Sequence, residues 1–378
     1  MNKVLINASN LHVGGGVQVA ASFITELAGM TDRLPSCEVF IYVSSAVNAN
    51  LMAAGFSASG VEGYEVFDVH GLKAFKKKNR DKFTGFDLVF TIFGPLYLPR
   101  DVPNHIVGFA QPWIVYPNNE VNRLLSFKQA LLLRLKFLTQ WLFFRRAARL
   151  VVELPHVKNG LVEGKSFPSV RIDVVSNCVS PIYFDEPLWA PVSTLGCVQQ
   201  SVIKIGYVTR DYPHKNLGLL VAVANELQRI STKKYQFYVT LTESEWAQRS
   251  EAFRAAICNV GPINIAQCPT FYQAMDGVFF PSLLECFSIT PLEAMVMKRP
   301  LFASDRGFVR DCCGENAFYY DPLDADAAAN RIEEWFGGTS DEVRAAHVER
   351  AYAHVLGLPG SRDRASAYIE IIEKQLAL

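Results

Sequence analysis

Two carboxylates in the second half of the chain have the type and spacing to bind a hydroxylated, phosphorylated ligand. Glu285 and Glu293 are separated by seven residues, and Pro291 between them is typical of the first turn of a helix. Carboxylates accept hydrogen bonds from hydroxyl groups such as those of a sugar, and free N–H groups at a helix start can bind phosphate. The alternative is a capped surface helix, where acids in the first turn are common.

Two cations follow the first strand expected in the same half of the chain. Arg210 and Lys215 lie between an apolar run at residues 202–208 and a helical pattern at residues 217–228. An Arg can chelate two phosphate oxygens and a Lys adds a point charge, so the pair suits a diphosphate. Ordinary loop cations remain the alternative.

A glycine-rich turn lies near the N-terminus. Gly14, Gly15 and Gly16 follow an apolar run at residues 4–6 and precede a helical pattern at residues 17–27. Glycines there let the backbone approach a ligand. The dinucleotide fingerprint and the P-loop are both absent, which argues against a nicotinamide dehydrogenase. A simple tight turn is the alternative.

Short apolar, β-branched runs position these residues, and helical patterns separate the runs. In the first half they fall at residues 4–6, 39–43, 87–93, 106–109, 150–152 and 172–175, and in the second half at residues 202–208, 237–241, 277–280, 300–303 and 317–320. Continuous runs of this kind indicate parallel strands that are buried on both faces. The sequence therefore predicts two doubly wound α/β domains with a cleft between them.

The two series define the expected domains. Four breakers at Pro181, Pro187, Pro191 and Gly196 indicate a linker. We expect an N-terminal domain over residues 1–178, a C-terminal domain over residues 195–361, and a last helix at residues 362–378 that packs back on the first domain.

Composition excludes several classes of protein. The 378 residues carry 37 Lys+Arg and 37 Asp+Glu, so a general nucleic-acid binder is not expected. The eight cysteines form no C-x-x-C pair and are interpreted as reduced thiols. No secretory signal or membrane-spanning run is expected, which favours a cytoplasmic protein.

The segment from Arg123 to Arg149 carries seven basic residues and no acids, interleaved with leucines and aromatic residues. A helix of this composition is typical of one that lies in a membrane interface. The alternative is a core helix with solvated cations.

Taken together, these motifs resemble family 4 glycosyltransferases. The resemblance rests on Glu285 and Glu293, on His214-Lys215-Asn216-Leu217, and on the segments 303–305, 314–317 and 320–324. It implies the GT-B fold, which consists of two facing Rossmann-like domains. It also implies retaining transfer of a hexose-type sugar from a nucleotide sugar, with no cofactor and no metal.

The resemblance also implies a role for each site residue. Arg210 and Lys215 would neutralise the departing diphosphate. Glu285 would bind hydroxyls of the transferred sugar, and Glu293 would hold the ribose. The remaining donor contacts would come from Gly15, Gly16, Phe287, Ser288, Ile289 and Thr290.

Two positions depart from the family pattern. Gln111 stands where many members have a His; it can hydrogen-bond a sugar or an acceptor but cannot take a proton. Ser288 stands where Gly is commoner, so its Cβ narrows the expected donor pocket.

The basic segment points to the acceptor. We expect a lipid-linked glycan at the cytoplasmic face of a bacterial inner membrane, in O-antigen or other surface-polysaccharide synthesis, with the enzyme bound peripherally through residues 123–149. Two alternatives are a sugar-nucleotide epimerase or hydrolase on the same scaffold, and a non-catalytic scaffold protein.

Overall fold

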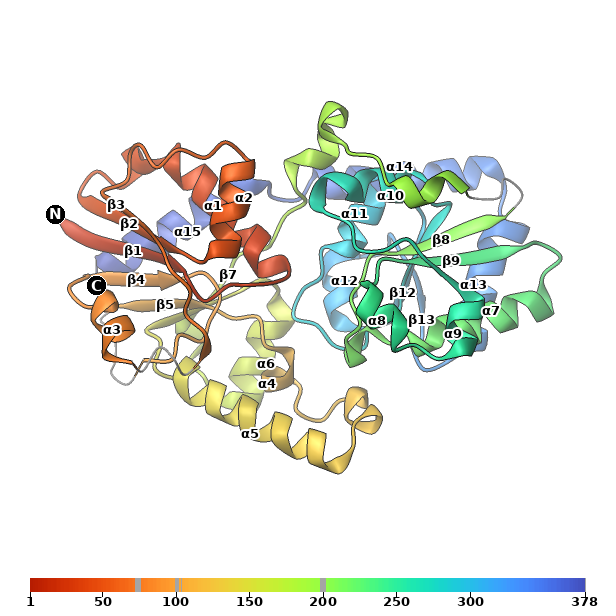
Figure 1. The fold of residues 1–378 in the computed structure, drawn as a ribbon, viewed down its shortest axis with the longest axis horizontal. Coiled ribbons are helices and arrows are strands. Elements are labelled where there is room, and N and C mark those ends of the chain that lie inside the picture. Colours follow the sequence, from red (N-terminus) through yellow and green to blue (C-terminus); the bar gives the residue numbers. More distant parts are fainter. Residues whose placement is uncertain (72–75, 99–101, 103, 198–201, 378) are drawn as a thin grey trace. The chain divides into compact units, whose positions relative to one another are not determined.

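The computed structural model describes residues 1–71, 76–98, 102, 104–197 and 202–377. Contacts between Cα atoms divide it into two compact units (Figure 1). Unit 1 comprises Met1–Asn118, Leu125–Cys178 and Pro359–Leu378, and unit 2 comprises Asn119–Leu124 and Val179–Leu358.

Unit 1 is built on a parallel sheet that has seven strands among the described residues, in the order β3-β2-β1-β4-β5-β6-β7. The strands are β1 (Asn2–Ala8), β2 (Cys37–Val43), β3 (Gly63–Val66), β4 (Leu88–Thr91), β5 (His105–Gly108), β6 (Arg149–Val152) and β7 (Ile172–Val174). The helices are α1 (Gly15–Ala28), α2 (Ser45–Ala53), α3 (Lys77–Arg80), α4 (Pro112–Val115), α5 (Phe127–Phe144), α6 (Pro155–Lys165) and α15 (Ser361–Leu376).

Unit 2 repeats this plan. Its parallel sheet has six described strands in the order β10-β9-β8-β11-β12-β13. The strands are β8 (Ile203–Tyr207), β9 (Tyr235–Val239), β10 (Ile257–Asn259), β11 (Gly277–Phe280), β12 (Leu301–Ser304) and β13 (Phe318–Tyr320). The helices are α7 (Gly218–Ile230), α8 (Glu243–Ala247), α9 (Glu251–Ala256), α10 (Cys268–Gln273), α11 (Thr290–Val296), α12 (Gly307–Cys313), α13 (Ala325–Glu333) and α14 (Asp341–Leu356).

The doubly wound α/β architecture predicted from the sequence is confirmed in both units. The central strands β4, β5, β6, β11 and β12 are buried along their whole length, as expected of parallel strands covered on both faces. The edge strands β3 and β10 were not predicted. Both are short and partly exposed, so their sequences lack the continuous apolar run that marks a buried strand.

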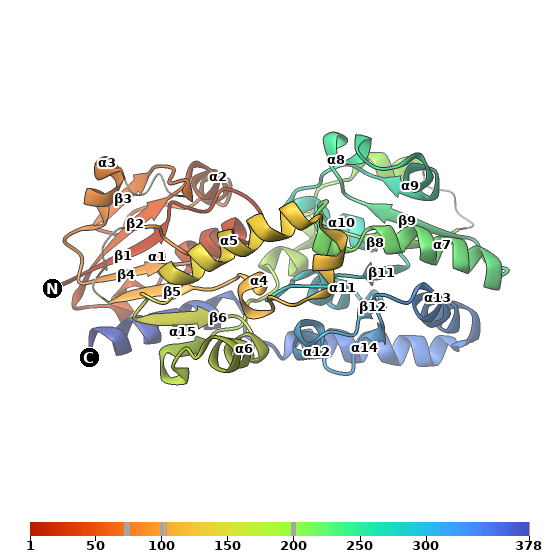
Figure 2. The ribbon, with the colours of Figure 1, turned by 90° about the horizontal axis from the view of Figure 1, so that it is seen from below.

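The last helix of the chain packs in unit 1, and Figures 1 and 2 both draw α15 beside the sheet of that unit. Tyr368 meets Phe23 of α1 edge to face, with the ring centroids 4.9 Å apart. The buried guanidinium of Arg364 donates to the Ser22 hydroxyl at 2.8 Å and to Asn177. A buried charge needs such polar partners, so α15 is held by specific bonds as well as by its apolar face.

The basic segment 123–149 is not one helix, and that part of the prediction was wrong. Arg123 lies in a 3-10 turn, α5 ends at Phe144, and Arg149 opens β6. Arg149 is buried and donates from Nε and Nη2 to the two carboxylate oxygens of Asp173, at 2.7 and 2.8 Å. This two-bond pairing satisfies the guanidinium inside the sheet, so its charge faces Asp173 and not solvent.

Within the part of the chain that the structure describes, no helix combines the length and the apolar character needed to cross a bilayer.

Candidate active site

Strand order locates the candidate site of unit 2. The chain leaves β8 toward β9 and β10 on one side and then returns to β11 on the other side. The carboxyl ends of β8 and β11 therefore flank a topological switch point, which is where open parallel sheets bind ligands. The loop of residues 208–216 follows β8, and the loop of residues 281–289 follows β11.

Hydrogen bonds join these two loops. The carbonyl oxygen of His214 accepts from the amide of Leu283 at 2.8 Å and from the hydroxyl of Ser282 at 3.2 Å. The Ser304 hydroxyl, at the end of β12, donates to the Ser282 carbonyl at 2.7 Å. Three neighbouring strand ends are thus bonded to one another, which fixes the side chains that they carry.

Lys215 and Glu285 meet at this point. Lys215 Nζ lies 2.8 Å from Glu285 Oε1, and their side chains are only 15% and 11% exposed. Burial lowers the pKa of Lys215, but the Glu285 carboxylate more than offsets this effect, so the pKa lies above its ordinary value. Burial raises the pKa of Tyr207 to about 12, so its hydroxyl stays neutral. The ammonium of Lys215 is therefore the positive charge at this point.

His214 adds no second charge beside Lys215. Burial lowers its pKa to about 4; the Glu285 carboxylate opposes this shift, and the ammonium of Lys215 adds to it. At neutral pH the imidazole is therefore uncharged, and its ring stacks on Tyr212 at 5.6 Å between centroids.

Arg210 is held at the rim of the same loop. Its Nε lies 3.0 Å from both oxygens of Glu245, and its side chain is 54% exposed. The Glu245 carboxylate also accepts from the backbone N–H of Thr242 and caps α8. Sequence reasoning missed Glu245 as a partner of Arg210, although Thr242-x-x-Glu245 is a readable capping-box signature.

The second carboxylate lies deeper. Glu293 is buried in the first turn of α11, where its Oε2 accepts from the Tyr272 hydroxyl at 2.9 Å. Burial raises the pKa of Glu293, while the hydroxyls of Tyr272 and Tyr183 counteract this shift. Sequence reasoning did not find the two tyrosines, because they lie 21 and 110 positions before Glu293 and nothing in their spacing marks them.

Residues 287–290, which were predicted as donor contacts, lie at the start of α11. α11 begins at Thr290 with Pro291 in its first turn. Ser288 and Thr290 are buried, and Phe287 and Ile289 are half-buried. The structure therefore gathers Lys215 and Glu285 into direct contact, with residues 287–290 and Glu293 following Glu285 along the chain.

The other predicted residues belong to unit 1. Gly14 has φ 77°, a conformation that favours glycine, and a Cβ on Gly15 would meet only open space. Both lie at the start of α1, in the loop that follows β1. This loop leaves the sheet at the switch point between β1 and β4. Gln111 is the N-cap of α4 after β5 and is half-buried.

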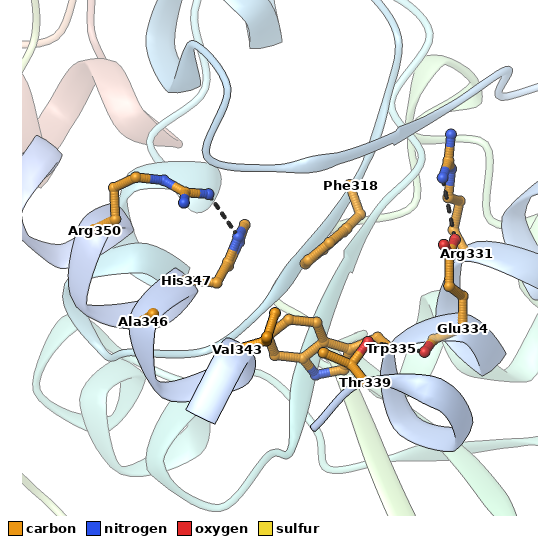
Figure 3. A pocket seen from close by; sticks show the side chains of 9 residues that line it. All are labelled: Phe318, Arg331, Glu334, Trp335, Thr339, Val343, Ala346, His347 and Arg350. Atoms are coloured by element: carbon orange, nitrogen blue, oxygen red, sulfur yellow. Dashed lines mark hydrogen bonds and ion pairs between the residues drawn. The ribbon is translucent and has the colours of Figure 1, made fainter. Parts of the chain in front are cut away.

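A cavity of about 280 Å³ lies elsewhere in unit 2 (Figure 3). Phe318, Trp335 and His347 contribute rings to it, and Arg350 donates to His347 at 2.9 Å. Since Phe318 opens β13, the cavity lies toward the amino end of that strand, opposite to the end at which such sheets bind ligands.

Of the described residues, the one group that could hold a metal ion is His12, Asp68 and His70 in unit 1.

Residues 202–337 match the family model "Glycosyl transferases group 1". A search of curated protein sequences found no match.

Solved structures resemble the whole chain. A glycosyltransferase from Rickettsia africae is 16% identical over 99% of this chain and 98% of its own, with a TM-score of 0.69. HepE from Anabaena, solved with UDP and glucose, is 15% identical over 99% and 100%, with a TM-score of 0.66. Sucrose-phosphate synthase from Thermosynechococcus elongatus is 16% identical over 100% and 99%, also with a TM-score of 0.66.

At these identities the structural likeness establishes the fold, and the family match adds the class of enzyme for unit 2. The chain is thus a transferase of GT-B fold, and residues 202–337 in its unit 2 are similar to the glycosyl transferases group 1 family.

Proposed function

We propose that the enzyme is a retaining glycosyltransferase that moves a hexose-type sugar from a nucleoside diphosphate to a glycan acceptor. The observation that carries this proposal is the largely buried Lys215–Glu285 pair at the switch point of unit 2. It sets a cation for phosphate beside a carboxylate for sugar hydroxyls, the two groups that a nucleotide sugar presents next to its reacting carbon.

The proposed reaction needs charge stabilisation more than a protein base. The bond between the sugar's anomeric carbon and the β-phosphate oxygen breaks, and the acceptor oxygen bonds the same carbon from the same face. The acceptor proton passes to the leaving phosphate, and nucleoside diphosphate departs. Lys215 and Arg210 stabilise the negative charge that develops on the diphosphate, which is the role such cations play best in a water-poor site.

The other residues position the donor and acceptor. Glu285 accepts from sugar hydroxyls, Glu293 from the ribose, and the backbone of residues 287–290 contacts the sugar and phosphates. In unit 1, Gly15 and Gly16 allow close approach of the backbone to a phosphate or acceptor, and Gln111 hydrogen-bonds sugar or acceptor. The two cations supply the positive charge, so we propose no metal for this step.

The exposed surface of α5 leads us to propose a class of acceptor. Leu131, Leu135, Leu138 and Leu142 recur at helical spacing and are each about half exposed, whereas Phe137 and its neighbours on the opposite face are buried. Exposed cations flank this apolar stripe at Lys128, Arg134, Lys136, Arg145 and Arg146. Apolar and cationic side chains together suit an anionic bilayer, so we propose a lipid-linked glycan at the inner face of a bacterial membrane, in O-antigen or related synthesis.

The test is a donor screen. The enzyme is incubated with UDP-, GDP- and dTDP-sugars and a membrane extract, and nucleoside diphosphate and glycolipid are measured by mass spectrometry. UDP-sugars come first because HepE was solved with UDP. The proposal is supported if release of nucleoside diphosphate requires the extract and if NMR shows that the glycolipid product retains the anomeric configuration of the donor sugar.

The same screen separates the alternatives. An epimerase or hydrolase would change the nucleotide sugar without the extract, and a scaffold would release nothing. An inverted anomeric centre in the product would contradict the retaining mechanism.

A further inference from the structure

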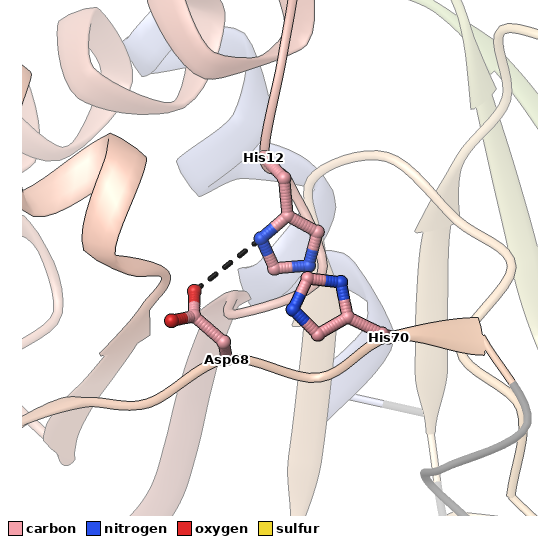
Figure 4. Close-up of side chains that lie close together, drawn as sticks. All are labelled: His12, Asp68 and His70. Carbon is pink, nitrogen blue, oxygen red and sulfur yellow. Dashed lines mark ion pairs between the residues drawn. The ribbon is translucent and has the colours of Figure 1, made fainter.

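Three potential metal ligands meet in unit 1. His12 lies in the loop after β1, and Asp68 and His70 follow β3 (Figure 4). The backbone amide of Val69 donates to the Ser9 carbonyl at 2.9 Å, which joins the two segments. The ligand atoms of His12, Asp68 and His70 all lie within 4.8 Å of one another.

The hydrogen bond of His12 determines which nitrogen faces Asp68. His12 Nε2 lies 3.0 Å from the Val69 carbonyl oxygen, and because a carbonyl can only accept, Nε2 must carry the hydrogen. In the neutral ring Nδ1 then presents a lone pair, and it lies 3.3 Å from Asp68 Oδ1. Two lone pairs at this distance repel each other unless a cation, either a proton or a metal, lies between them.

Asp68 is held in place as a carboxylate. Its Oδ1 accepts from the Ser45 amide at 3.0 Å, and its Oδ2 accepts from the Ser45 hydroxyl at 2.7 Å. These hydrogen bonds lower the pKa of Asp68. Both His12 and Asp68 therefore have the outer hydrogen bonds that orient metal ligands in proteins.

The distance between the two ligand atoms fits a metal. Bonds of about 2.0–2.1 Å in a tetrahedral zinc site place neighbouring ligand atoms about 3.3 Å apart. Nδ1 of His12 and Oδ1 of Asp68 are separated by this distance. His70 is not yet in position, because its ring stacks on His12 with centroids 3.9 Å apart and planes 20° apart. Its side chain is exposed and can rotate to turn a ring nitrogen toward the same point.

We propose that His12, Asp68 and His70 form a binding site for a divalent transition-metal ion, with zinc as the best match. Two imidazoles and one carboxylate suit zinc better than magnesium or calcium, which prefer oxygen ligands alone. Three protein ligands leave a fourth position for water. All three ligands belong to unit 1, and the site departs from the prediction of a protein without metal.

Isothermal titration of zinc chloride into the chelator-treated full chain tests the site. We expect one equivalent to bind at pH 7.5. The variants His12→Ala and Asp68→Asn should bind at least about 100-fold more weakly, and Ser45→Ala, which removes only an orienting hydroxyl, about 10-fold more weakly. The variant His70→Ala should also lose affinity.

His354 provides the matched control. Its Nε2 also bonds a backbone carbonyl, that of Cys312 at 2.8 Å, and among the described residues no ion pair links it to a carboxylate. His354→Ala should therefore bind zinc as the wild type does. Zinc held by cysteines would persist in all of these variants. Uptake that His12→Ala and Asp68→Asn leave unchanged, or no uptake at all, would overturn the proposal.

NMR of the histidine rings adds a readout that does not depend on affinity. Zinc should shift the Nδ1 resonance of His12, leave Nε2 protonated, and move the His70 ring signals as the stack opens. If zinc leaves both rings unchanged, the cation between His12 and Asp68 is a proton, and the metal site is disproved.

Discussion

At the scale of single residues, the proposed chemistry depends on Lys215 and Glu285. Each was predicted from its position at a strand end, but their direct contact was not, because 70 positions separate them and neither spacing nor residue type encodes the pairing. Their burial makes the pair sensitive to change, since removal of one partner leaves an uncompensated charge.

We predict that Lys215→Gln or Glu285→Gln lowers turnover about a hundredfold or more, because each removes a group that acts on the reacting donor. Nucleoside diphosphate release under saturating donor measures this. The control is Lys298→Gln, which breaks the exposed Lys298–Glu349 pair of the same unit and should leave turnover unchanged.

Loss of folding is separated from loss of chemistry by a double variant. Lys215→Met with Glu285→Leu removes both charges and should recover much of the stability that either single change costs. It should stay inactive. Wild-type turnover in this folded double variant would refute the assigned roles.

At the scale of elements, the sequence predicted the central strands well but missed the edge strands β3 and β10. Buried runs such as Gly277–Phe280 are marked by composition, whereas β3 and β10 are formed through pairing with a neighbour and carry no such mark. Arg149 was assigned to the basic helix because its local sequence continues that composition. Its partner Asp173, 24 positions away, decides otherwise.

The N-terminus of α8 gives a prediction of its own. Glu245→Gln keeps the cap of α8, because Gln also serves at this position of a capping box, but it removes the charge that anchors Arg210. We expect an unchanged melting temperature and a catalytic efficiency lowered about tenfold. The kinetic effect is no larger because Arg210 is half exposed and its ion pair with Glu245 is screened by solvent. Thermal melts and steady-state kinetics measure the two effects. Unaltered kinetics would show that the anchoring of Arg210 does not matter.

The exposed stripe of α5 predicts membrane binding. Leu135→Ser with Leu138→Ser should weaken flotation with anionic vesicles about tenfold or more, because two apolar side chains lose their transfer into lipid. Added salt should weaken wild-type binding through its cations.

The matched control uses two leucines of unit 2 with similar exposure. Leu188→Ser with Leu356→Ser, at 57% and 54% exposed in the wild type, should float as the wild type does. Equal loss in both double variants, or no wild-type flotation, would count against α5 as the membrane contact.

At the scale of the whole molecule, the stability should depend on pH through buried histidines. Burial lowers the pKa of His105, His214 and His347 from 6.5 to about 4. The unfolded chain therefore binds more protons than the native state between these values, and stability is lost as the pH falls from about 6.5 to about 4. Glu293, whose pKa burial raises, acts in the opposite direction.

His105→Gln isolates one contribution. The amide can keep a hydrogen bond to the Thr91 hydroxyl, which lies 2.9 Å from His105 Nε2, but it does not titrate. Urea unfolding at pH 6.5 and pH 4 should show a fall in unfolding free energy smaller than that of the wild type by about 3 kcal/mol. Parallel pH curves for the two proteins would disprove the buried neutral imidazole.

The sequence also predicts the fold better than it predicts the side-chain contacts of the two candidate sites. The alternation of strands and helices predicts two doubly wound sheets, because a strand that is buried on both faces is marked by a continuous apolar run in its own sequence. Contacts such as His12 with Asp68 and Arg210 with Glu245 arise only when separate strand-end loops converge, so local spacing could not reveal them.

A crystal structure of the enzyme with a nucleoside diphosphate tests the central claim most directly. We predict that the diphosphate lies between the carboxyl ends of β8 and β11, with Lys215 Nζ and the Arg210 guanidinium within hydrogen-bonding distance of its oxygens. A diphosphate bound in the cavity beside Phe318, or only at the glycine turn of unit 1, would contradict it.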